Sequence, residues 1–533
     1  MSTYNLFHHI SKRTLLSIVL FAAIMTGAGC KKFLDKVPKD FISPENSFKD
    51  EASLNTALTG IYDILGKEEM YGSNIPLIHS IADDGFYSRS ATIAGPQVYN
   101  FDAADPTINE MWKYLYMGIE RANLLLANAD KVAMDETAKN AIKGEARFLR
   151  AYYYYVLVDF WGDVPLKTTP STSVNEVDIA RTPSRQVYDF ILKEMEAAES
   201  MVYTSTKIGF GGRVSKTVID GILARVCLKM AGHPLNDVSK YAEALKWAKK
   251  VVTPDSGPKE HQLNGSFSNI FIKHCADQYD IKESMWEVEL YGNRGGDFEA
   301  GRLGNGIGIQ CNDEVFGFSY GFVNTTTKLY NSYGASDTRR DWTIAPYAYT
   351  YNVVSGVSTV KDSTFFTSAQ IYNRNIAKWR RHYEKVLPRN KNYTPVNFPL
   401  LRYADVLLML AEAENEVNGP TNIALSAVKE VRDRSNATDV TTTIGSAAAL
   451  RTLIQEERFR ELAFEGLRKH DLIRWGMFVS TMNNLGTEIT NTGGTAYAYG
   501  ALAGKNVRTK HELYPIPTLE LSLNRGMVQN PGW

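Results

Sequence analysis

The stretch GEARFLRAYYYYVLVDFWGDVPL, residues 144–166, constrains the fold more than any other part of this chain. Apolar residues recur there at steps of three and four, the spacing of one helical face: Ile142, Ala146, Leu149, Tyr153, Val156 and Phe160. The run of consecutive tyrosines puts aromatic bulk on every side of the middle turn, so this helix must pack against several neighbours. Gly162 permits a left-handed cap and Pro165 cannot continue a helix. The sequence therefore predicts a buried central helix that ends near Trp161.

Two further segments have the pattern of helix–turn–helix units of tetratricopeptide type. One is VIDGILARVCLKMAG followed by KYAEALKWAKKVV, within residues 218–252, and the other is LLRYADVLLMLAEAENEV followed by NIALSAVKEVRDRS, within residues 400–435. A last strong helix is predicted over Leu450–Trp475. The predicted fold class is mostly α, with tetratricopeptide-like helix pairs as scaffold and a loop-rich, partly β excursion.

The scaffold is predicted to occupy approximately residues 47–251 and 400–480 of a single body, 47–533, with the excursion over approximately 252–399. The excursion is rich in Gly, Asn, Thr and aromatic residues, and it contains the strand-like runs ESMWEVELY (283–291) and FGFSYGFV (316–323). After the last helix, residues 487–504 are again rich in Gly, Thr and Tyr. Because connecting segments carry function more often than the frame that holds them, we expect the binding residues in the excursion and loops.

The N-terminus carries an export signal. Lys12 and Arg13 precede the apolar run LLSIVLFAAIM, and small residues then lead to Cys30. The run is about half of what crosses a bilayer as a helix, so a retained transmembrane segment is the weaker interpretation. This arrangement resembles a bacterial lipoprotein signal and predicts a signal peptide over 1–29, acylation of Cys30 and a tether over 30–46. Plain secretion is the alternative.

Charge and cysteine content exclude other classes. Lys plus Arg and Asp plus Glu are each 59, so a phosphate backbone would meet no general attracting field, and nucleic acid is not expected as a partner. Besides Cys30, the chain has Cys227, Cys275 and Cys311, whose long spacing indicates neither a zinc site nor a disulfide framework. Buried free thiols are expected.

No motif makes a credible catalytic set, metal site or cofactor site. Residues 317–321 spell G-x-S-x-G, but a nucleophile elbow needs a strand before it and a helix after it, and here it lies in a loop-rich segment. Asp83 and Asp84 could be an acid–base pair, although loop hydrogen bonding or capping is favoured, since adjacent side chains usually point apart. The charges of the last helix, such as Glu456 with Arg460 and Glu465 with Arg468, predict salt-bridged packing along the helix and to its neighbours.

Several long motifs, taken together and in order, resemble the SusD/RagB family of outer-membrane nutrient-uptake lipoproteins. These are FLDKVP after Cys30, the central-helix stretch, PLLRYADVLLMLAEAENEV, LIQEERFRELAFEGLRKHDLIRWGMF and the closing LYPIPTLELSLNRGMVQNPGW. The resemblance implies four tetratricopeptide-like pairs, a loop-rich ligand half and no catalysis. It also implies a lipid-anchored protein on the cell surface that binds a glycan or another oligomer and delivers it to a SusC-like TonB-dependent transporter.

Two alternatives from other classes remain, namely a membrane-anchored secreted hydrolase and a tetratricopeptide adaptor that binds peptides or proteins. For the glycan binder, aromatic rings would stack on sugar faces while amides, carboxylates and guanidinium groups bond the hydroxyls. The candidate ligand-binding residues are Tyr87, Arg89, Tyr99, Phe101, Tyr291, Asn293, Arg294, Asp297, Phe316, Phe318 and Tyr320.

Overall fold

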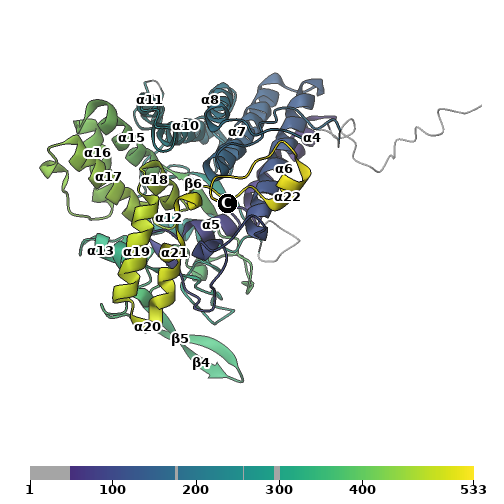
Figure 1. Ribbon diagram of the computed structural model, residues 1–533. Coiled ribbons are helices and arrows are strands. Elements are labelled where there is room, and N and C mark those ends of the chain that lie inside the picture. The colour runs from purple at the N-terminus through teal and green to yellow at the C-terminus, as the bar shows by residue number, and fades with distance from the viewer. Residues whose placement is uncertain (1–47, 174–177, 256, 293–299) are drawn as a thin grey trace, which may run out of the picture. The chain divides into compact units, whose positions relative to one another are not determined.

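The computed structural model describes residues 48–173, 178–255, 257–292 and 300–533. The predicted signal peptide, Cys30 and the predicted tether lie outside these residues. The body from Lys49 onward is mostly helical (Figure 1). Its helices are α4 Glu51–Gly66, α5 Asn74–His79, α6 Pro106–Asn128, α7 Glu136–Trp161, α8 Ser184–Glu199, α9 Ser205–Ile208, α10 Lys216–Ala231, α11 Lys240–Val252, α12 Phe267–Cys275, α13 Thr327–Ser332, α14 Arg340–Thr343, α15 Tyr403–Asn418, α16 Asn422–Arg434, α17 Ala447–Glu461, α18 Arg468–Arg474, α19 Phe478–Thr492, α20 Gly494–Tyr497, α21 Leu502–Asn506 and α22 Thr518–Leu523. Its strands are β1 Gly85–Tyr87, β2 Ser284–Val288, β3 Val323–Thr325, β4 Tyr347–Val354, β5 Val357–Phe365 and β6 Phe398–Arg402.

Helix α7 is the predicted central helix, and it ends at Trp161 as expected. The Asp135 side chain caps its start, and Gly162 follows its end with φ 74°. Its four tyrosines are buried, and three of their hydroxyls bond polar groups elsewhere in the protein. Tyr152 bonds the hydroxyl of Tyr71 at 2.7 Å, and Tyr153 and Tyr154 donate to backbone carbonyls. Burial of these rings therefore leaves few polar atoms without a partner.

The helical scaffold is a continuous chain of packed helices. α6 and α8 pack on α7, α10 packs on α8 and α11, α11 packs on α15, and α15 packs on α16 and α17. Where α6 crosses α7, Gly118 faces Tyr153 so closely that an added Cβ would lie 2.5 Å from the ring. The predicted pairs α10–α11 and α15–α16 are confirmed as tetratricopeptide-like units. None of the described helices is long and apolar enough to span a bilayer.

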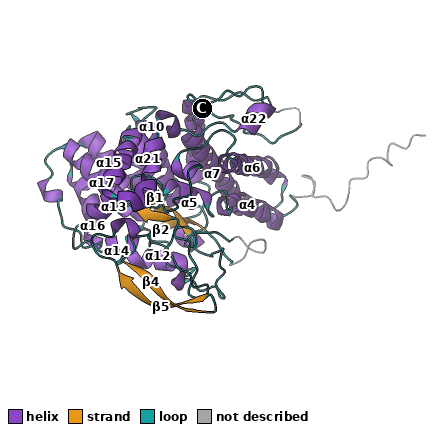
Figure 2. Ribbon diagram, turned by 60° about the horizontal axis from the view of Figure 1, so that its bottom comes forward, coloured by secondary structure: helices purple, strands orange, loops and turns teal. Residues whose placement is uncertain are grey.

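The strands form three separate two-stranded antiparallel sheets, of which the β4–β5 hairpin lies at the bottom edge of the view in Figure 2. β1 pairs with β3, β2 with β6, and β4 with β5 in a hairpin. The run 283–291 contains β2 as predicted, and Trp286 of this strand packs against Phe148 and Tyr152 of α7. Most of the run 316–323 is not the predicted strand. Ser319 makes an isolated bridge to Cys311 and Val323 begins β3, while the glycines at 317 and 321 adopt φ 130° and 59°, outside the range of extended strands.

One prediction for the C-terminal part was wrong. The helix predicted over 450–475 is two helices, α17 and α18, because Phe464 and Gly466 adopt φ 65° and 77° and turn the chain between them. The Gly-, Thr- and Tyr-rich segment 487–504 is largely helical, in α19, α20 and α21. α19 and α21 are in contact at Gly486 and Gly504. A Cβ added at either glycine would clash with the backbone of the other helix, which explains the glycines at these positions. The boundaries of the excursion at 252 and 399 stay a prediction.

A buried charge network joins the loop-rich excursion to the scaffold helices. It consists of Glu283, Asp337, Arg339, Lys378, Arg402, Arg432, Arg434, Glu457, Glu461 and Glu465. Arg402 at the end of β6 bonds Glu461 of α17 at 2.9 Å and Glu465 at 2.7 Å. Arg339 of the excursion bonds Glu457 at 2.6 Å. Buried charges are tolerated only when they are paired, so this network fixes the excursion in one position on the scaffold.

The charges of α17 and α18 therefore form salt bridges to neighbouring elements, as predicted. The predicted pair of Glu465 with Arg468 is not formed. Glu456 and Arg460 are 3.6 Å apart along α17. Glu465 instead pairs with Arg402 and Lys378, while Arg468 pairs with Asp83. The turn between α17 and α18 separates Glu465 from Arg468, which the assumption of one continuous helix could not anticipate.

Candidate functional site

A row of four aromatic rings lies on the loop-rich side. Three of them, Phe318, Tyr320 and Phe322, occupy every second position of one segment. Tyr320 and Phe322 stack with ring centroids 4.9 Å apart, and Phe318 meets Tyr320 edge-on at the same distance. Tyr87 of β1 stacks on Phe322 at 5.7 Å. All four rings are half-buried. The structure thus brings together Tyr87, Phe318 and Tyr320, which the sequence predicted, with Phe322, which it did not.

Arg89, another predicted ligand residue, holds this row in place. Its guanidinium donates to the carbonyls of Tyr320 and Gly321 and lies 4.8 Å from the centre of the Phe322 ring. Its hydrogen-bonding capacity is therefore largely used inside the protein. We assign Arg89 a positioning role for the rings.

A pocket of about 400 Å³ adjoins the row, with Tyr320 and Phe322 as one wall. We call it the aromatic pocket; its other lining residues are Ser73, Asn74, Pro76, Leu77, Arg302, Leu303, Asn305, Gly306 and Ile307. This size falls in the range of small-molecule sites. Phe322 stacks on both Tyr320 and Tyr87, so much of its ring surface is already packed within the protein. Ring edges carry partial positive charge, which suits contact with oxygen atoms of a ligand.

The polar groups of the aromatic pocket differ in whether they already form hydrogen bonds within the protein. Asn305 is buried, and its amide donates to the carbonyls of Phe318 and Lys391, so it supports the loop. Ser73 and Asn74 come from the segment that enters α5, and their side chains form no hydrogen bond with any described residue. These two neutral groups, together with Arg302, are therefore free to bind a ligand. Composition alone offered no signal for them.

The remaining predicted residues lie elsewhere. Tyr99 is 2% exposed and donates its hydroxyl to the carbonyl of Ile81, so it is a core residue and not a ligand contact. Phe101 packs on His511, Tyr514 and Trp533 near the C-terminus.

Phe316 packs between Tyr349 of β4 and His382, where it anchors the β4–β5 hairpin. Tyr291 is 59% exposed, outside the aromatic pocket. Asn293, Arg294 and Asp297 lie outside the described residues.

Asp83 and Asp84 are both fully buried and have different partners. Asp83 takes a two-point contact from Arg468, at 2.6 and 2.8 Å, and bonds Lys328 at 2.6 Å. Although burial by itself would raise it, these two cations hold the pKa of Asp83 below its ordinary value. Asp84 accepts from the backbone N–H of Phe464 at 3.1 Å. The pair ties β1 to α13 and to the turn before α18, and loop hydrogen bonding is the correct interpretation.

Asp84 provides a test of this interpretation through pH. Burial, followed by the neighbouring charge of Asp83, raises the pKa of Asp84 to about 7. The folded protein therefore binds this proton more tightly than the unfolded chain, so the contribution of Asp84 to stability is full below about pH 4 and is lost as the pH rises to about 7. We expect Asp84→Asn to abolish this dependence, so that its free energy of unfolding relative to the parent rises between pH 4 and pH 7. The difference is at most a few kcal/mol, because one pKa unit corresponds to about 1.4 kcal/mol. Urea unfolding at several pH values measures it, and an unchanged difference across the range would contradict the assignment.

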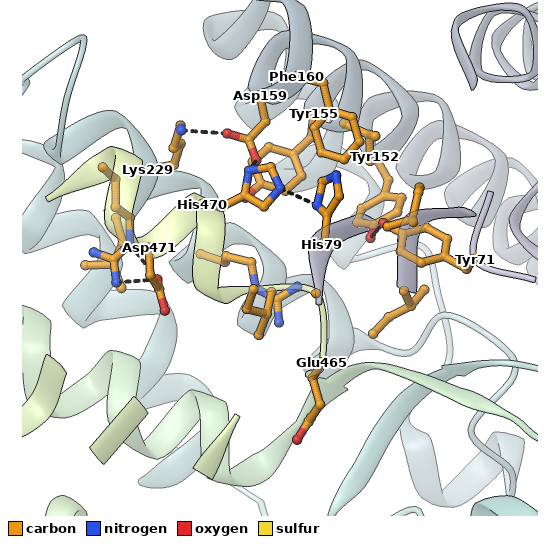
Figure 3. Close-up of a pocket in the computed structure, with 18 of the residues that line it drawn as sticks. Tyr71, His79, Tyr152, Tyr155, Asp159, Phe160, Lys229, Glu465, His470 and Asp471 are labelled. Carbon is orange, nitrogen blue, oxygen red and sulfur yellow. Dashed lines mark hydrogen bonds and ion pairs between the residues drawn. The ribbon is translucent and has the colours of Figure 1, made fainter. Parts of the chain in front are cut away.

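A second, smaller pocket contains a buried relay of titratable groups (Figure 3). Asp159 of α7 bonds Lys229 at 2.6 Å and His470 at 2.7 Å, and His470 bonds His79 at 2.8 Å. Burial lowers the pKa of His79 well below its ordinary value, which keeps this imidazole neutral. The pocket has only about 60 Å³, enough for a few water molecules and well below the size of ligand sites. The relay is a structural network between α5, α7, α10 and α18.

The structure offers no catalytic arrangement around Ser319 of the G-x-S-x-G segment. Its side chain is buried, and the hydroxyl donates to the carbonyl of Asn305 at 3.1 Å. Neither a strand before it nor a helix directly after it is present in this described segment. Cys227, Cys275 and Cys311 are buried free thiols, as predicted. Within the described parts of the chain, no group of three or more His, Cys, Asp or Glu side chains is arranged to hold a metal ion.

Two family models match this chain. Residues 280–533 match the model described as SusD family, and residues 32–228 match the model described as "Starch-binding associating with outer membrane". SusD-like protein P25 of Formosa agariphila is 25% identical over 561 aligned positions, which cover 96% of this chain and 97% of that protein. The starch-binding protein SusD of Bacteroides thetaiotaomicron is 24% identical, with 82% of this chain and 81% of that protein covered.

A solved structure has the same fold. The crystal structure of a SusD homolog from Bacteroides thetaiotaomicron superposes with a TM-score of 0.82 at 26% identity, covering 92% of this chain and 98% of that chain. The likeness therefore extends over the helical scaffold and the loop-rich side together.

Proposed function

This chain belongs to the SusD family, and on that premise we propose that it binds a glycan at the cell surface and delivers it to a SusC-like TonB-dependent outer-membrane transporter. Binding takes place in the aromatic pocket and leaves the glycan chemically unchanged. The observation that carries the proposal is the combination of a pocket of about 400 Å³, a wall of aromatic rings and polar side chains without internal partners.

The chemistry of the aromatic pocket suits a carbohydrate. A sugar presents many hydroxyls, each of which donates and accepts, next to apolar C–H groups. Ser73 and Asn74 can meet hydroxyls, while Leu77, Ile307 and the ring edges meet the apolar parts. A site with such mixed lining fixes the orientation of a ligand through its few polar groups. The name of the starch-binding relative supports a carbohydrate of several linked units.

Incubation with a panel of soluble polysaccharides tests the proposal. Retention of one polysaccharide in native affinity gels, with no new reducing ends released, is the expected result. Release of shortened products would instead make the protein a membrane-anchored hydrolase. Failure to retain any polysaccharide, combined with capture of peptides along the scaffold helices, would make it a tetratricopeptide adaptor.

We further propose that Cys30 anchors the protein through acyl chains, with the predicted tether leading to the body. More than one acyl chain holds a protein durably at a bilayer, whereas a single chain binds only marginally. We expect Cys30→Ala to shift nearly all of the protein from the membrane fraction to the soluble fraction, with glycan affinity unchanged. Cell fractionation and gel retention measure the two effects. Persistence of the variant in the membrane fraction would refute the anchor, and Cys311→Ala is a matched control because that thiol is buried in the body.

A further inference from the structure

Among the described residues that line the aromatic pocket, Arg302 is the one that carries a positive charge, and it is incompletely paired. Its Nε lies 3.6 Å from the carboxylate of Glu68, beyond hydrogen-bond distance, and has no acceptor although it is buried. Among the described residues, no acceptor forms a hydrogen bond with any of its guanidinium nitrogens. The ring of Tyr393 lies 5.6 Å from its centre. A guanidinium therefore borders the pocket with its planar set of donors unused.

Three other arginines of the loop-rich side, by contrast, donate hydrogen bonds to acceptors within the protein. Arg381 donates to Glu384 and to the carbonyls of Phe318, Asn390 and Tyr393, and Arg389 donates to four backbone carbonyls. Arg89 is committed to the aromatic row. These three arginines stabilise loops, whereas the donors of Arg302 form no hydrogen bond with any described residue and are open to a molecule in the pocket. An unpaired charged donor is costly to keep partly buried, so a ligand acceptor there gains affinity.

On the basis of the proposed function, we propose that the aromatic pocket selects a sugar residue that bears an oxyanion, either the carboxylate of a uronic acid or a sulfate ester. The guanidinium fork matches two oxygens of such a group in parallel, and these charge-assisted bonds are roughly twice as strong as neutral ones. A hydroxyl of a neutral sugar supplies one acceptor and leaves the rest of the fork unpaired. Ser73 and Asn74 then bond hydroxyls of the same sugar unit, and the edges of Tyr320 and Phe322 close the wall.

Glu68 is the acidic partner of Arg302, and its position is compatible with an anionic ligand. It faces Nε and leaves the terminal nitrogens of Arg302 open. Its side chain is 39% exposed, so water screens its repulsion of an incoming anion. The terminal nitrogens of the Arg302 guanidinium therefore still attract an anionic ligand.

Calorimetric titration with three oligosaccharides of equal length tests the inference: an oligogalacturonate, a sulfated galactan fragment and a neutral glucan. We expect at least one anionic probe to bind roughly 10- to 100-fold more tightly than the neutral one, the ratio that one or two charge-assisted bonds supply. Arg302→Gln should remove this ratio, because it should weaken binding of the anionic probe far more than binding of the neutral one. High salt should reduce it in the parent protein.

Arg451→Gln is the matched control, because Arg451 is 45% exposed, pairs with Glu416 and lies on α17. It removes the same charge and should keep the preference for the anionic probe. Equal or tighter binding of the neutral probe, or a preference that survives in Arg302→Gln, would overturn the inference while leaving glycan binding intact. Failure of every neutral and anionic polysaccharide of the panel to bind would overturn the proposed function as well.

Discussion

Glu461→Ala should lower the free energy of unfolding by about 3–5 kcal/mol, the cost of leaving buried charges without their partner. The carboxylate of Glu461 is fully buried and accepts hydrogen bonds from Arg339, Arg402 and Arg434 at 3.0, 2.9 and 2.6 Å. Although burial alone would raise it, these three cations hold the pKa of Glu461 well below its ordinary value. Removal of one carboxylate therefore leaves three buried guanidinium groups undercompensated. Because Arg339 comes from the excursion and Arg402 ends β6, which pairs with β2 of the excursion, we expect the loop-rich side to loosen first.

Chemical unfolding and hydrogen exchange measure this effect. Glu416→Ala is the matched control, since Glu416 makes a two-point contact with Arg451 at 2.7 and 2.6 Å, but that arginine is 45% exposed. An ion pair of this kind contributes at most about 1 kcal/mol. A loss in Glu461→Ala no larger than in the control would show that the network does not hold the excursion on the scaffold.

The double variant Tyr320→Ala, Phe322→Ala should weaken binding of the retained glycan by roughly 30-fold or more. Truncation of central aromatic anchors typically costs about 2 kcal/mol or more, and about 1.4 kcal/mol corresponds to a factor of ten. These two rings form one wall of the aromatic pocket and also fix Tyr87 and Phe318. Their loss therefore removes both contact area and the shape of the pocket.

Phe190→Ala provides the control for this variant. Phe190 is a half-buried ring on α8 that packs against Tyr154, so its truncation removes a comparable ring from the scaffold. Unchanged affinity in Phe190→Ala and weakened affinity in the double variant is the expected pattern. Parent-like affinity in the double variant, with its circular dichroism spectrum intact, would place the glycan elsewhere on the surface.

Local sequence patterns predicted those parts of the fold that local physics determines. The start and end of α7 follow from Asp135 and Gly162, and the pairs α10–α11 and α15–α16 follow from their periodicity and turns. The break between α17 and α18 escaped prediction because Phe464, a bulky residue, adopts a left-handed conformation. That conformation is supported from outside, by the bond of its N–H to Asp84, which lies far away in sequence.

The candidate site could be predicted in residue type but not in geometry. Aromatic residues in loops identified Tyr87, Phe318 and Tyr320, yet the same criterion selected Tyr99, whose ring the fold buries. Phe322 had a usable signal, since it continues the alternation of positions 318 and 320. Arg302 had none, because its significance depends on the absence of acceptors around it in three dimensions.

The pairing of strands that are remote in sequence has a consequence for how this protein reaches its native state. Gly85 pairs with Thr325, and Ser284 pairs with Arg402, so two of the three sheets close very long loops. Contacts of high sequence separation form slowly, whereas helix pairs such as α10–α11 assemble from neighbouring residues. The helical frame should therefore assemble early during folding. The aromatic pocket, whose ring row includes Tyr87 of β1, should form only after β1 has paired with β3.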